Sequence, residues 1–259
     1  MKSITLLGSL LAFIPNAMSQ SSLIVAHRGY SHVAPENSLT AFEAAIAVGA
    51  PYFELDVQKS ADGTPIVIHD ETLERTASSN AIGLIQSLSD EELQTVRIGY
   101  PERFGRAFEN EPLPTLSDAL QLAQGRIRVC VEIKVAGIES AIVADIQKWK
   151  MDEDVVIFSF LPEVLTQIHS IAPHLKLLFL KSDATSDDLN HCLDIGAAAI
   201  GVGGKTKLDE AFINEAAAMD LEVWRWTVDD VAEMRHLQNL GVHAIITNRP
   251  DLGMTFSIE

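Results

Sequence analysis

Three carboxylates occupy positions where a folded chain could bring them together. Glu54 and Asp56 lie in the apolar run 52–57, and Glu132 lies in a similar run, 127–133. If these runs are strands, alternate residues share a face, so Glu54 and Asp56 point the same way, about 6–7 Å apart along the backbone. Neighbouring anions repel each other unless a cation lies between them. Carboxylates without sulfur ligands predict a hard-cation site for one Mg²⁺ or Ca²⁺, whereas zinc would more often recruit a histidine.

Two histidines and two cations accompany these carboxylates. His27 and His69 each end an apolar run beside a charged residue, a position that suits acid-base work. Arg28 offers a planar fork that matches a phosphate, and Lys134 offers a point charge. Together with a metal, these groups predict attack at phosphorus. The structural alternative is that the carboxylates only pair with Arg28 and Lys134 as buried ion pairs.

Repeated β-α alternation would position these residues. The β-rich runs are 23–26, 52–57, 65–69, 127–133, 154–158, 175–180, 197–201, 221–226 and 244–247, and amphipathic helical stretches include 39–48, 117–124, 138–150, 209–219 and 231–240. This pattern predicts an α/β fold, a TIM-type (β/α)8 barrel, in which the ends of the strands meet at one rim. An open, doubly wound sheet is the alternative, although no GxGxxG follows the first run.

Nine runs exceed the eight strands of such a barrel. Asp62 and Gly63 form a hairpin signal between runs 52–57 and 65–69, so one of these runs could be an irregular unit. Alternatively, the last run only closes the end of the barrel. Residues 71–114, rich in glycine and proline, predict an insertion after the third run, which we expect to cap the rim.

An ordered set of motifs carries a family resemblance. The set comprises Ala-His-Arg-Gly at 26–29, Ala-Pro-Glu-Asn-Ser at 34–38, Phe-Glu-Leu-Asp-Val at 53–57, Asp-Gly-Thr-Pro-Ile-Val-Ile-His-Asp at 62–70, Leu-Pro-Thr-Leu at 113–116, Val-Glu-Ile-Lys at 131–134, Trp-Thr-Val at 226–228 and Ile-Ile-Thr-Asn-Arg-Pro at 245–250. From about residue 23 to 252 the chain resembles the bacterial glycerophosphodiester phosphodiesterase family. Minor departures are Ser38 in place of the more usual Thr, Pro51 in place of an acidic residue, and Asn248 in place of the common Asp.

The resemblance implies an activity and a role for each matching residue. The activity is hydrolysis of glycerophosphodiesters to glycerol 3-phosphate and an alcohol. The implied roles are acid-base catalysis by His27 and His69, metal binding by Glu54, Asp56 and Glu132, and substrate binding by Arg28, Lys134, Trp226 and Glu36.

Two other functions stay open at this point. A lipid-directed enzyme that resembles the sphingomyelinase-type phospholipases D would leave a cyclic phosphate instead of a hydrolysed product. An exported binding protein would capture phosphodiesters without cleaving them, but anion binding does not require two histidines.

Composition restricts the partners. The chain has 259 residues, 47% of them apolar, which suits a single barrel domain over residues 20–259. Its formal net charge of −17 argues against nucleic acid and anionic membranes as partners. A small phosphodiester is therefore the expected partner, and the oligomeric state does not follow from the sequence.

The N-terminal residues 1–19 predict a signal peptide. Lys2 precedes an apolar run, and Ala17 and Ser19 are small residues before a cleavage site at Gln20. The run is too short to span a membrane, and no later segment is long and apolar enough. We expect a periplasmic or secreted protein, or a cytoplasmic one if this segment is not a signal.

The two cysteines are expected to stay unpaired. Cys130 shares its strand face with Glu132 and should point into the barrel, whereas Cys192 falls in an outer helix. The same alternation predicts that Arg128 points into the base of the barrel and meets a buried partner, with Glu222 as the candidate.

Overall fold

Eight parallel strands form a closed ring in the computed structural model, which describes residues 21–78 and 81–255. The predicted signal segment lies outside the described residues. The ring consists of β1 (Leu23–Ala26), β2 (Tyr52–Lys59), β4 (Arg128–Ile133), β5 (Val155–Ser159), β6 (Lys176–Lys181), β7 (Ala199–Val202), β8 (Glu222–Arg225) and β9 (Ala244–Thr247). Pairing of β1 with both β2 and β9 closes it. The prediction of a TIM-type barrel is confirmed.

The ninth predicted run lies outside the ring. It forms the short strand β3 (Pro65–Val67), which pairs antiparallel with β2 through the turn that contains Gly63. Gly63 has a φ of +87°, the left-handed region in which glycine carries no steric penalty. The hairpin signal at residues 62–63 therefore explains the surplus strand, while the last run, β9, is a full member of the ring.

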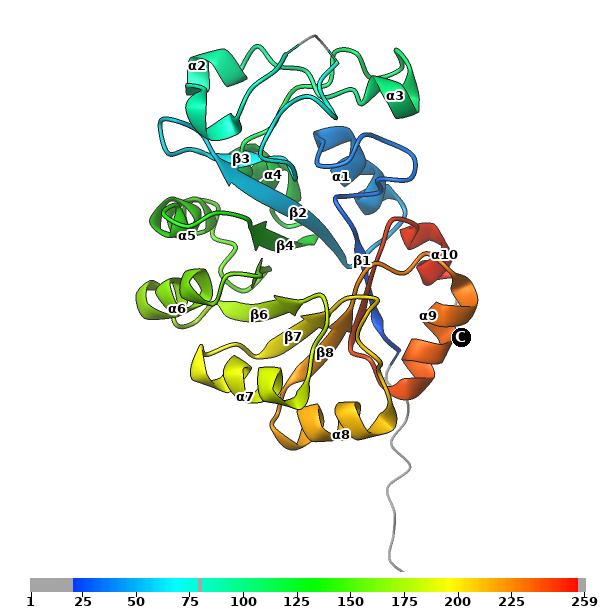
Figure 1. The fold of residues 1–259 in the computed structure, drawn as a ribbon. Coiled ribbons are helices and arrows are strands. Elements are labelled where there is room, and N and C mark those ends of the chain that lie inside the picture. The colour runs from blue at the N-terminus through cyan, green and yellow to red at the C-terminus, as the bar shows by residue number, and fades with distance from the viewer. Residues whose placement is uncertain (1–20, 79–80, 256–259) are drawn as a thin grey trace, which may run out of the picture.

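Helices cover the outside of the strands (Figure 1). They are α1 (Leu39–Ala47), α4 (Leu116–Ala123), α5 (Glu139–Lys148), α6 (Pro162–Ile171), α7 (Ser186–Asp194), α8 (Glu210–Ala218), α9 (Val231–Leu240) and α10 (Pro250–Met254). Side-chain caps start several of them, such as Thr115 with Asp118 at α4. Among the helices described, none has the length and apolarity that a membrane span requires.

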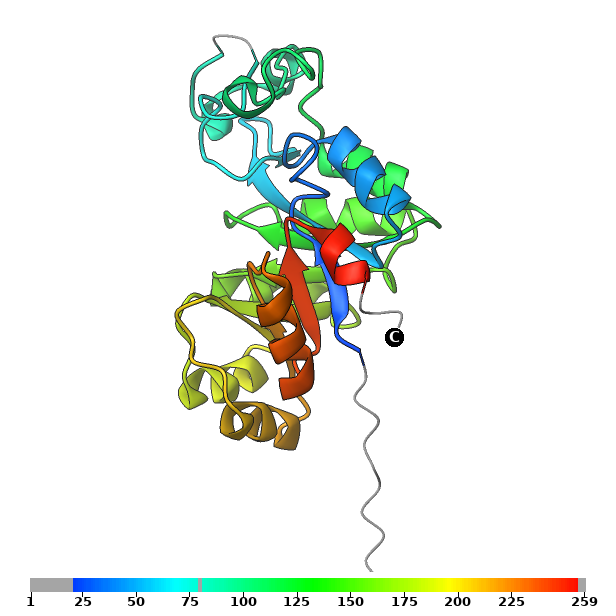
Figure 2. The same ribbon diagram turned by 90° about the vertical axis from the view of Figure 1, so that its right-hand side faces the viewer.

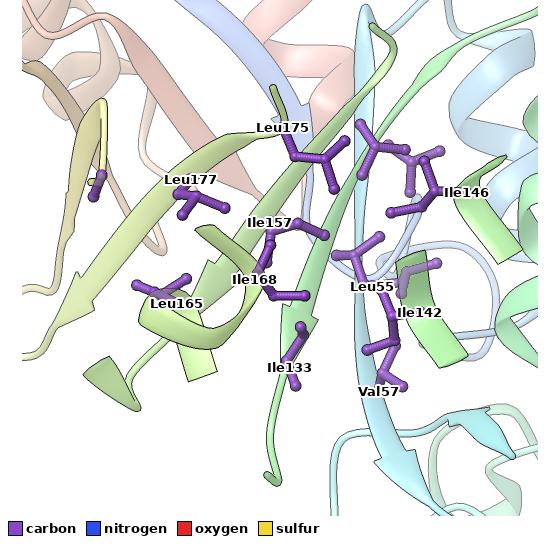
Figure 3. Packing of buried hydrophobic residues seen from close by; sticks show 14 of the residues in the cluster. Leu55, Val57, Ile133, Ile142, Ile146, Ile157, Leu165, Ile168, Leu175 and Leu177 are labelled. Atoms are coloured by element: carbon purple, nitrogen blue, oxygen red, sulfur yellow. The ribbon is translucent and has the colours of Figure 1, made fainter. Parts of the chain in front are cut away.

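Strand alternation divides the apolar residues into two layers. Leu55 and Val57 of β2 point outward and pack with residues of α5 such as Ile142 and Ile146 (Figure 3). Tyr52 and Cys130 point inward, where they join Trp224 in the barrel interior. Glu54 and Asp56 share the inward parity of Tyr52, so the same alternation that builds the core directs both carboxylates into the barrel.

The segment between β3 and α4 packs as a body of its own. In Figures 1 and 2 it lies at the top of the view, next to α1. It contains the short helices η1 (Ile85–Ser87), α2 (Asp90–Leu93) and α3 (Pro101–Phe104), and a separate apolar cluster that includes Leu73, Ile85 and Ile98. The predicted insertion therefore carries its own small core.

The cysteine prediction is confirmed and the prediction for Arg128 is wrong. Cys130 and Cys192 are both free and buried, Cys130 inside the ring and Cys192 between α7 and the strands.

Arg128 is the first residue of β4, and its side chain is 55% exposed. It donates to the Tyr52 hydroxyl at 3.1 Å, while Glu222 pairs with Lys176 at 2.7 Å. Strand parity predicts the face of a residue but not its depth, and the end of the strand leaves Arg128 in solvent.

Candidate active site

A cavity of about 240 Å³ opens where the parallel strands end. Its lining residues are His27, Arg28, Glu54, His69, Glu132, Lys134, Phe158, Phe160, Leu180, Trp226, Thr227 and Ile246. The charged side chains come from the β1, β2, β3 and β4 side of the barrel. The apolar side chains come from the β5, β6, β8 and β9 side. The cavity therefore has one polar half and one apolar half.

An acidic cluster lies at the polar half of the cavity. Glu54 and Asp56 of β2 and Glu132 of β4 each offer a carboxylate oxygen within 4.8 Å of the other two. The register of the barrel produces this arrangement, because Asp56 lies directly opposite Glu132 in the β2–β4 pair. Three oxygen donors this close suit a hard divalent cation.

The charge of the acidic cluster is only partly balanced by the neighbouring cations. Burial, followed by repulsion from Asp56 and Glu132, raises the pKa of Glu54 well above its ordinary value. Burial and repulsion from Asp56 also raise the pKa of Glu132 to about 7. Within the described residues, Glu54 Oε1 is buried without a hydrogen-bond partner. A divalent cation would neutralise this charge and supply the missing partner, so the residues fit a metal.

Two cations stand beside the acidic cluster. Arg28 Nε lies 3.2 Å from Asp56 Oδ2, and Lys134 Nζ lies 3.3 Å from Asp56 Oδ1 and 2.6 Å from Glu132. Burial alone would raise the pKa of Asp56, but the charges of Arg28 and Lys134 hold it below its ordinary value. Asp56 does not line the cavity, yet it fixes both cations that do.

A tight turn after β1 places Arg28 at the rim. Arg28 and the next residue, Gly29, have φ values of +55° and +79°. A Cβ on Gly29 would lie 2.7 Å from the backbone of Ala41 in α1, so only glycine fits this approach. The turn directs the Arg28 amide to Glu54 Oε2 at 2.9 Å.

His27 is held by residues from the far end of the chain. Its Nδ1 lies 2.7 Å from Asn248 Oδ1, and Asn248 Nδ2 donates to Asp229 at 2.8 Å. The Asp229 carboxylate can only accept, so Asn248 turns its oxygen to the ring and Nδ1 carries the hydrogen. Burial and the charge of Arg28 lower the pKa of His27 to about 4. The ring is therefore neutral at pH 7, with Nε2 as its free acceptor.

His69 lies two residues beyond β3, and Asp70 holds it. Its Nδ1–H donates to Asp70 Oδ1 at 2.7 Å, which leaves Nε2 for the cavity that the ring lines. Asp70 in turn accepts from Arg75, the residue by which the insertion reaches the site. No described residue of 71–114 lines the cavity itself, so the insertion does not cap it directly.

The apolar half is an aromatic wall. Phe160 and Trp226 meet edge to face with ring centroids 5.6 Å apart, and Phe158 lies below them in the interior cluster. Phe160 is 38% exposed, and Lys134 Nζ lies 6.0 Å from its ring centroid. The wall offers contact to the carbon skeleton of a small ligand opposite the charged groups.

The structure brings together most of the residues singled out in the sequence. All of them except Asp56 and Glu36 line the cavity, and these two lie behind Arg28. Further residues of the site were not predicted, among them Asp70, Arg75, Phe160 and Asn248. Asp70 and Asn248 lie inside quoted motifs, whereas Arg75 and Phe160 carry no local signal because their partners are distant in sequence.

Comparison with known proteins identifies the family of the chain. A family model described as "Glycerophosphoryl diester phosphodiesterase family" matches residues 27–252. The glycerophosphodiester phosphodiesterase of Caldanaerobacter subterraneus subsp. tengcongensis is 32% identical over 236 residues, which span 89% of this chain and 95% of that relative.

Solved structures share the fold of this chain. A glycerophosphodiester phosphodiesterase from Agrobacterium tumefaciens has a TM-score of 0.77 and 31% identity, over 90% of this chain and 99% of its own. A phosphodiesterase from Oleispira antarctica, in complex with the product sn-glycerol-3-phosphate, has a TM-score of 0.81 and 24% identity, over 92% and 97% of the two chains. Because the family model spans most of the chain, this protein belongs to the glycerophosphoryl diester phosphodiesterase family.

Proposed function

We propose that the cavity hydrolyses glycerophosphodiesters to glycerol 3-phosphate and an alcohol, with His27 and His69 as the acid-base pair and one Mg²⁺ or Ca²⁺ at the acidic cluster. The convergence of two histidines, two cations and three carboxylates at one cavity carries this proposal. The Oleispira phosphodiesterase, which shares the fold and was solved with sn-glycerol-3-phosphate, supports the product. No observation favours the lipid-directed or the non-catalytic alternative.

Arg28 and Lys134 would bind the phosphate. Both side chains line the cavity and are 18% exposed, so an anion can reach them from the polar half. Their present partners are carboxylates of the acidic cluster, and a phosphate oxygen can join these pairs without displacing them. Trp226 would contact the substrate from the opposite, apolar wall.

Glu54, Asp56 and Glu132 would hold the divalent cation. When bound, it supplies Lewis-acid charge stabilisation for a phosphoryl oxygen and neutralises the cluster. The protein itself contributes a rigid donor set, since two of the carboxylates lie on one strand and the third lies opposite in the neighbouring strand.

The two histidines would move the protons that hydrolysis requires. A proton must leave the attacking oxygen, and another must reach the oxygen of the departing alcohol as its bond to phosphorus breaks. His27 is neutral with Nε2 unprotonated, which suits acceptance. His69 is held through its Nδ1–H by Asp70, and in its imidazolium form it would carry a second proton on Nε2 to donate to the departing oxygen.

Release of glycerol 3-phosphate from glycerophosphocholine tests the proposal. We expect release by the purified protein, its loss after treatment with a chelator, and its return with Mg²⁺ or Ca²⁺. Undiminished release by metal-stripped protein would remove the metal from the proposal. A cyclic phosphate product from a lysolipid or sphingomyelin, with no release from glycerophosphocholine, would support the lipid-directed alternative.

We further propose that the protein is exported, on the basis of residues 1–19 alone. Expression of the whole chain in a Gram-negative host should yield a periplasmic product. Its intact mass should correspond to a chain that starts at Gln20. A cytoplasmic product of full mass would contradict export.

A further inference from the structure

One guanidinium in the insertion binds two carboxylates at once. Arg75 Nη1 and Nη2 donate to the two oxygens of Glu36, each at 2.8 Å. Arg75 Nε and Nη2 donate to the two oxygens of Asp70, at 2.5 and 3.0 Å. Each carboxylate therefore receives two hydrogen bonds from the same planar fork, a geometry that lysine cannot reproduce.

Each of these carboxylates in turn holds a residue of the cavity. Glu36 Oε1 accepts from Arg28 Nη1 at 2.6 Å, and Asp70 Oδ1 accepts from His69 Nδ1 at 2.7 Å. Neither Glu36 nor Asp70 lines the cavity, whereas Arg28 and His69 both do. Arg75 is thus the midpoint of a continuous chain that joins a phosphate-binding candidate to an acid-base candidate.

The charges along this chain balance only while Arg75 is present. Arg28 and Arg75 offset Glu36 and Asp70. Burial would raise the pKa of Glu36, but hydrogen bonds from Arg75, with the charges of Arg28 and Arg75, hold it below its ordinary value. Burial opposes ionisation of Asp70 as well, yet hydrogen bonds from Arg75 and His69 hold its pKa at about 2. Loss of Arg75 would leave net negative charge behind the phosphate-binding side.

The insertion fixes Arg75 from behind. The guanidinium carbon lies 5.4 Å from the centroid of the Tyr100 ring, and the Tyr100 backbone amide donates to Thr76 at 3.0 Å. Both Arg75 and Tyr100 belong to residues 71–114. Contacts within the insertion therefore hold the Arg75 side chain beside the site.

We propose that Arg75 is a positioning residue, which orients His69 through Asp70 and Arg28 through Glu36. The inference rests on the proposed function, since it assigns Arg75 to the same reaction. Its removal should lower kcat, because His69 loses its fixed orientation, and raise KM, because Arg28 loses part of its support and the local charge turns negative. We expect a loss in kcat/KM of about 10- to 100-fold, typical of supporting residues around a reactive group.

The test compares Arg75→Ala and Arg75→Lys with Arg106→Ala. Arg106 lies in the same insertion, its side chain is 88% exposed, and it pairs only with Glu109 among the contacts of the described residues, so it is a matched control. We expect both Arg75 variants to lose activity, Arg106→Ala to keep it, and millimolar guanidinium to restore part of the kcat of Arg75→Ala while equal sodium chloride does not. If Arg75→Ala fails to fold, Arg75→Lys carries the comparison.

A second readout does not depend on turnover. Nitrogen NMR of His69, assigned with a His69→Gln variant, should show a hydrogen-bonded Nδ1–H in the parent protein and its loss in the Arg75 variants. Wild-type kcat and KM in both Arg75 variants would overturn the inference, as would an unchanged His69 signal in a folded, inactive variant. A parent protein that cleaves no glycerophosphodiester would defeat the proposed function, while the His69 signal would still test the role of Arg75.

Discussion

His27 and Asn248 join the first and the last strand of the barrel. The Nδ1–H of His27, after β1, donates to Asn248 Oδ1, after β9, at 2.7 Å across 221 positions of sequence. Asn248 is anchored in turn by Asp229, which follows β8. The neutral amide of Asn248 therefore contacts the His27 ring, and the Asp229 carboxylate lies behind that amide.

Exchanging the side chains of Asp229 and Asn248 should change the pH dependence of kcat/KM. In Asp229→Asn/Asn248→Asp the carboxylate faces the ring, and the new amide can donate to it. Burial and the charge of Arg28 lower the pKa of His27 to about 4. An adjacent anion favours the imidazolium, so the pKa should rise by about one unit or more. Since His27 is proposed to accept a proton, the acidic limb of kcat/KM should move to higher pH.

The profile should be measured at saturating metal, with Asp229→Asn alone as the control. That single variant removes the carboxylate without bringing it to the ring, so its acidic limb should not move upward. An unmoved acidic limb in the folded double variant would argue against proton acceptance by His27.

Each histidine should be needed for turnover. His27→Ala and His69→Ala should each lower kcat on the order of 10²-fold or more, because positioned proton transfer contributes at least this much. His174 lies outside the cavity and pairs with Asp152 on the surface, so His174→Ala is a suitable control. Near-parental kcat in either cavity variant, with the fold verified by circular dichroism, would exclude that histidine from the mechanism.

Removal of one carboxylate should have opposite effects with and without metal. Glu54→Gln relieves the repulsion that Asp56 and Glu132 exert on Glu54. The unfolding free energy of the metal-free variant should therefore be higher than that of the metal-free parent. With Mg²⁺ or Ca²⁺ the order should reverse, because only the parent gains metal-binding energy. Thermal unfolding with a chelator and with each cation measures both effects, and a metal-induced shift retained in full by the variant would contradict this ligand set.

The head group should matter little to the rate. The charged lining residues belong to the polar half of the cavity, and the opposite wall is apolar, so no charged group there distinguishes one alcohol from another. Glycerophosphocholine, glycerophosphoethanolamine and glycerophosphoglycerol should be cleaved with kcat/KM values within about tenfold, a difference of ~1.4 kcal/mol. Bis(p-nitrophenyl) phosphate, which has no glycerol hydroxyls, should be a poor substrate. A preference well beyond tenfold for one head group would show that the apolar wall discriminates between the alcohols.

The sequence by itself determined the barrel and the residues of the polar half. Period-two alternation in 52–57 and 127–133 directs Glu54, Asp56 and Glu132 inward, because a strand has only two faces. The position of His27 and Arg28 at the end of β1 follows equally from the sequence, because both residues come directly after the apolar run 23–26.

Only the tertiary structure decided which groups those residues meet. Arg75 reaches Glu36 across 39 positions, and Asn248 reaches His27 across 221. Such pairs depend on barrel closure and on the path of the insertion, and neither leaves a periodic signal in the chain. The sequence also left open how deep in the barrel a side chain lies. Arg128 has inward parity, yet it begins its strand and its side chain stays in solvent. Parity fixes the direction of a side chain but not its distance from the end of the barrel.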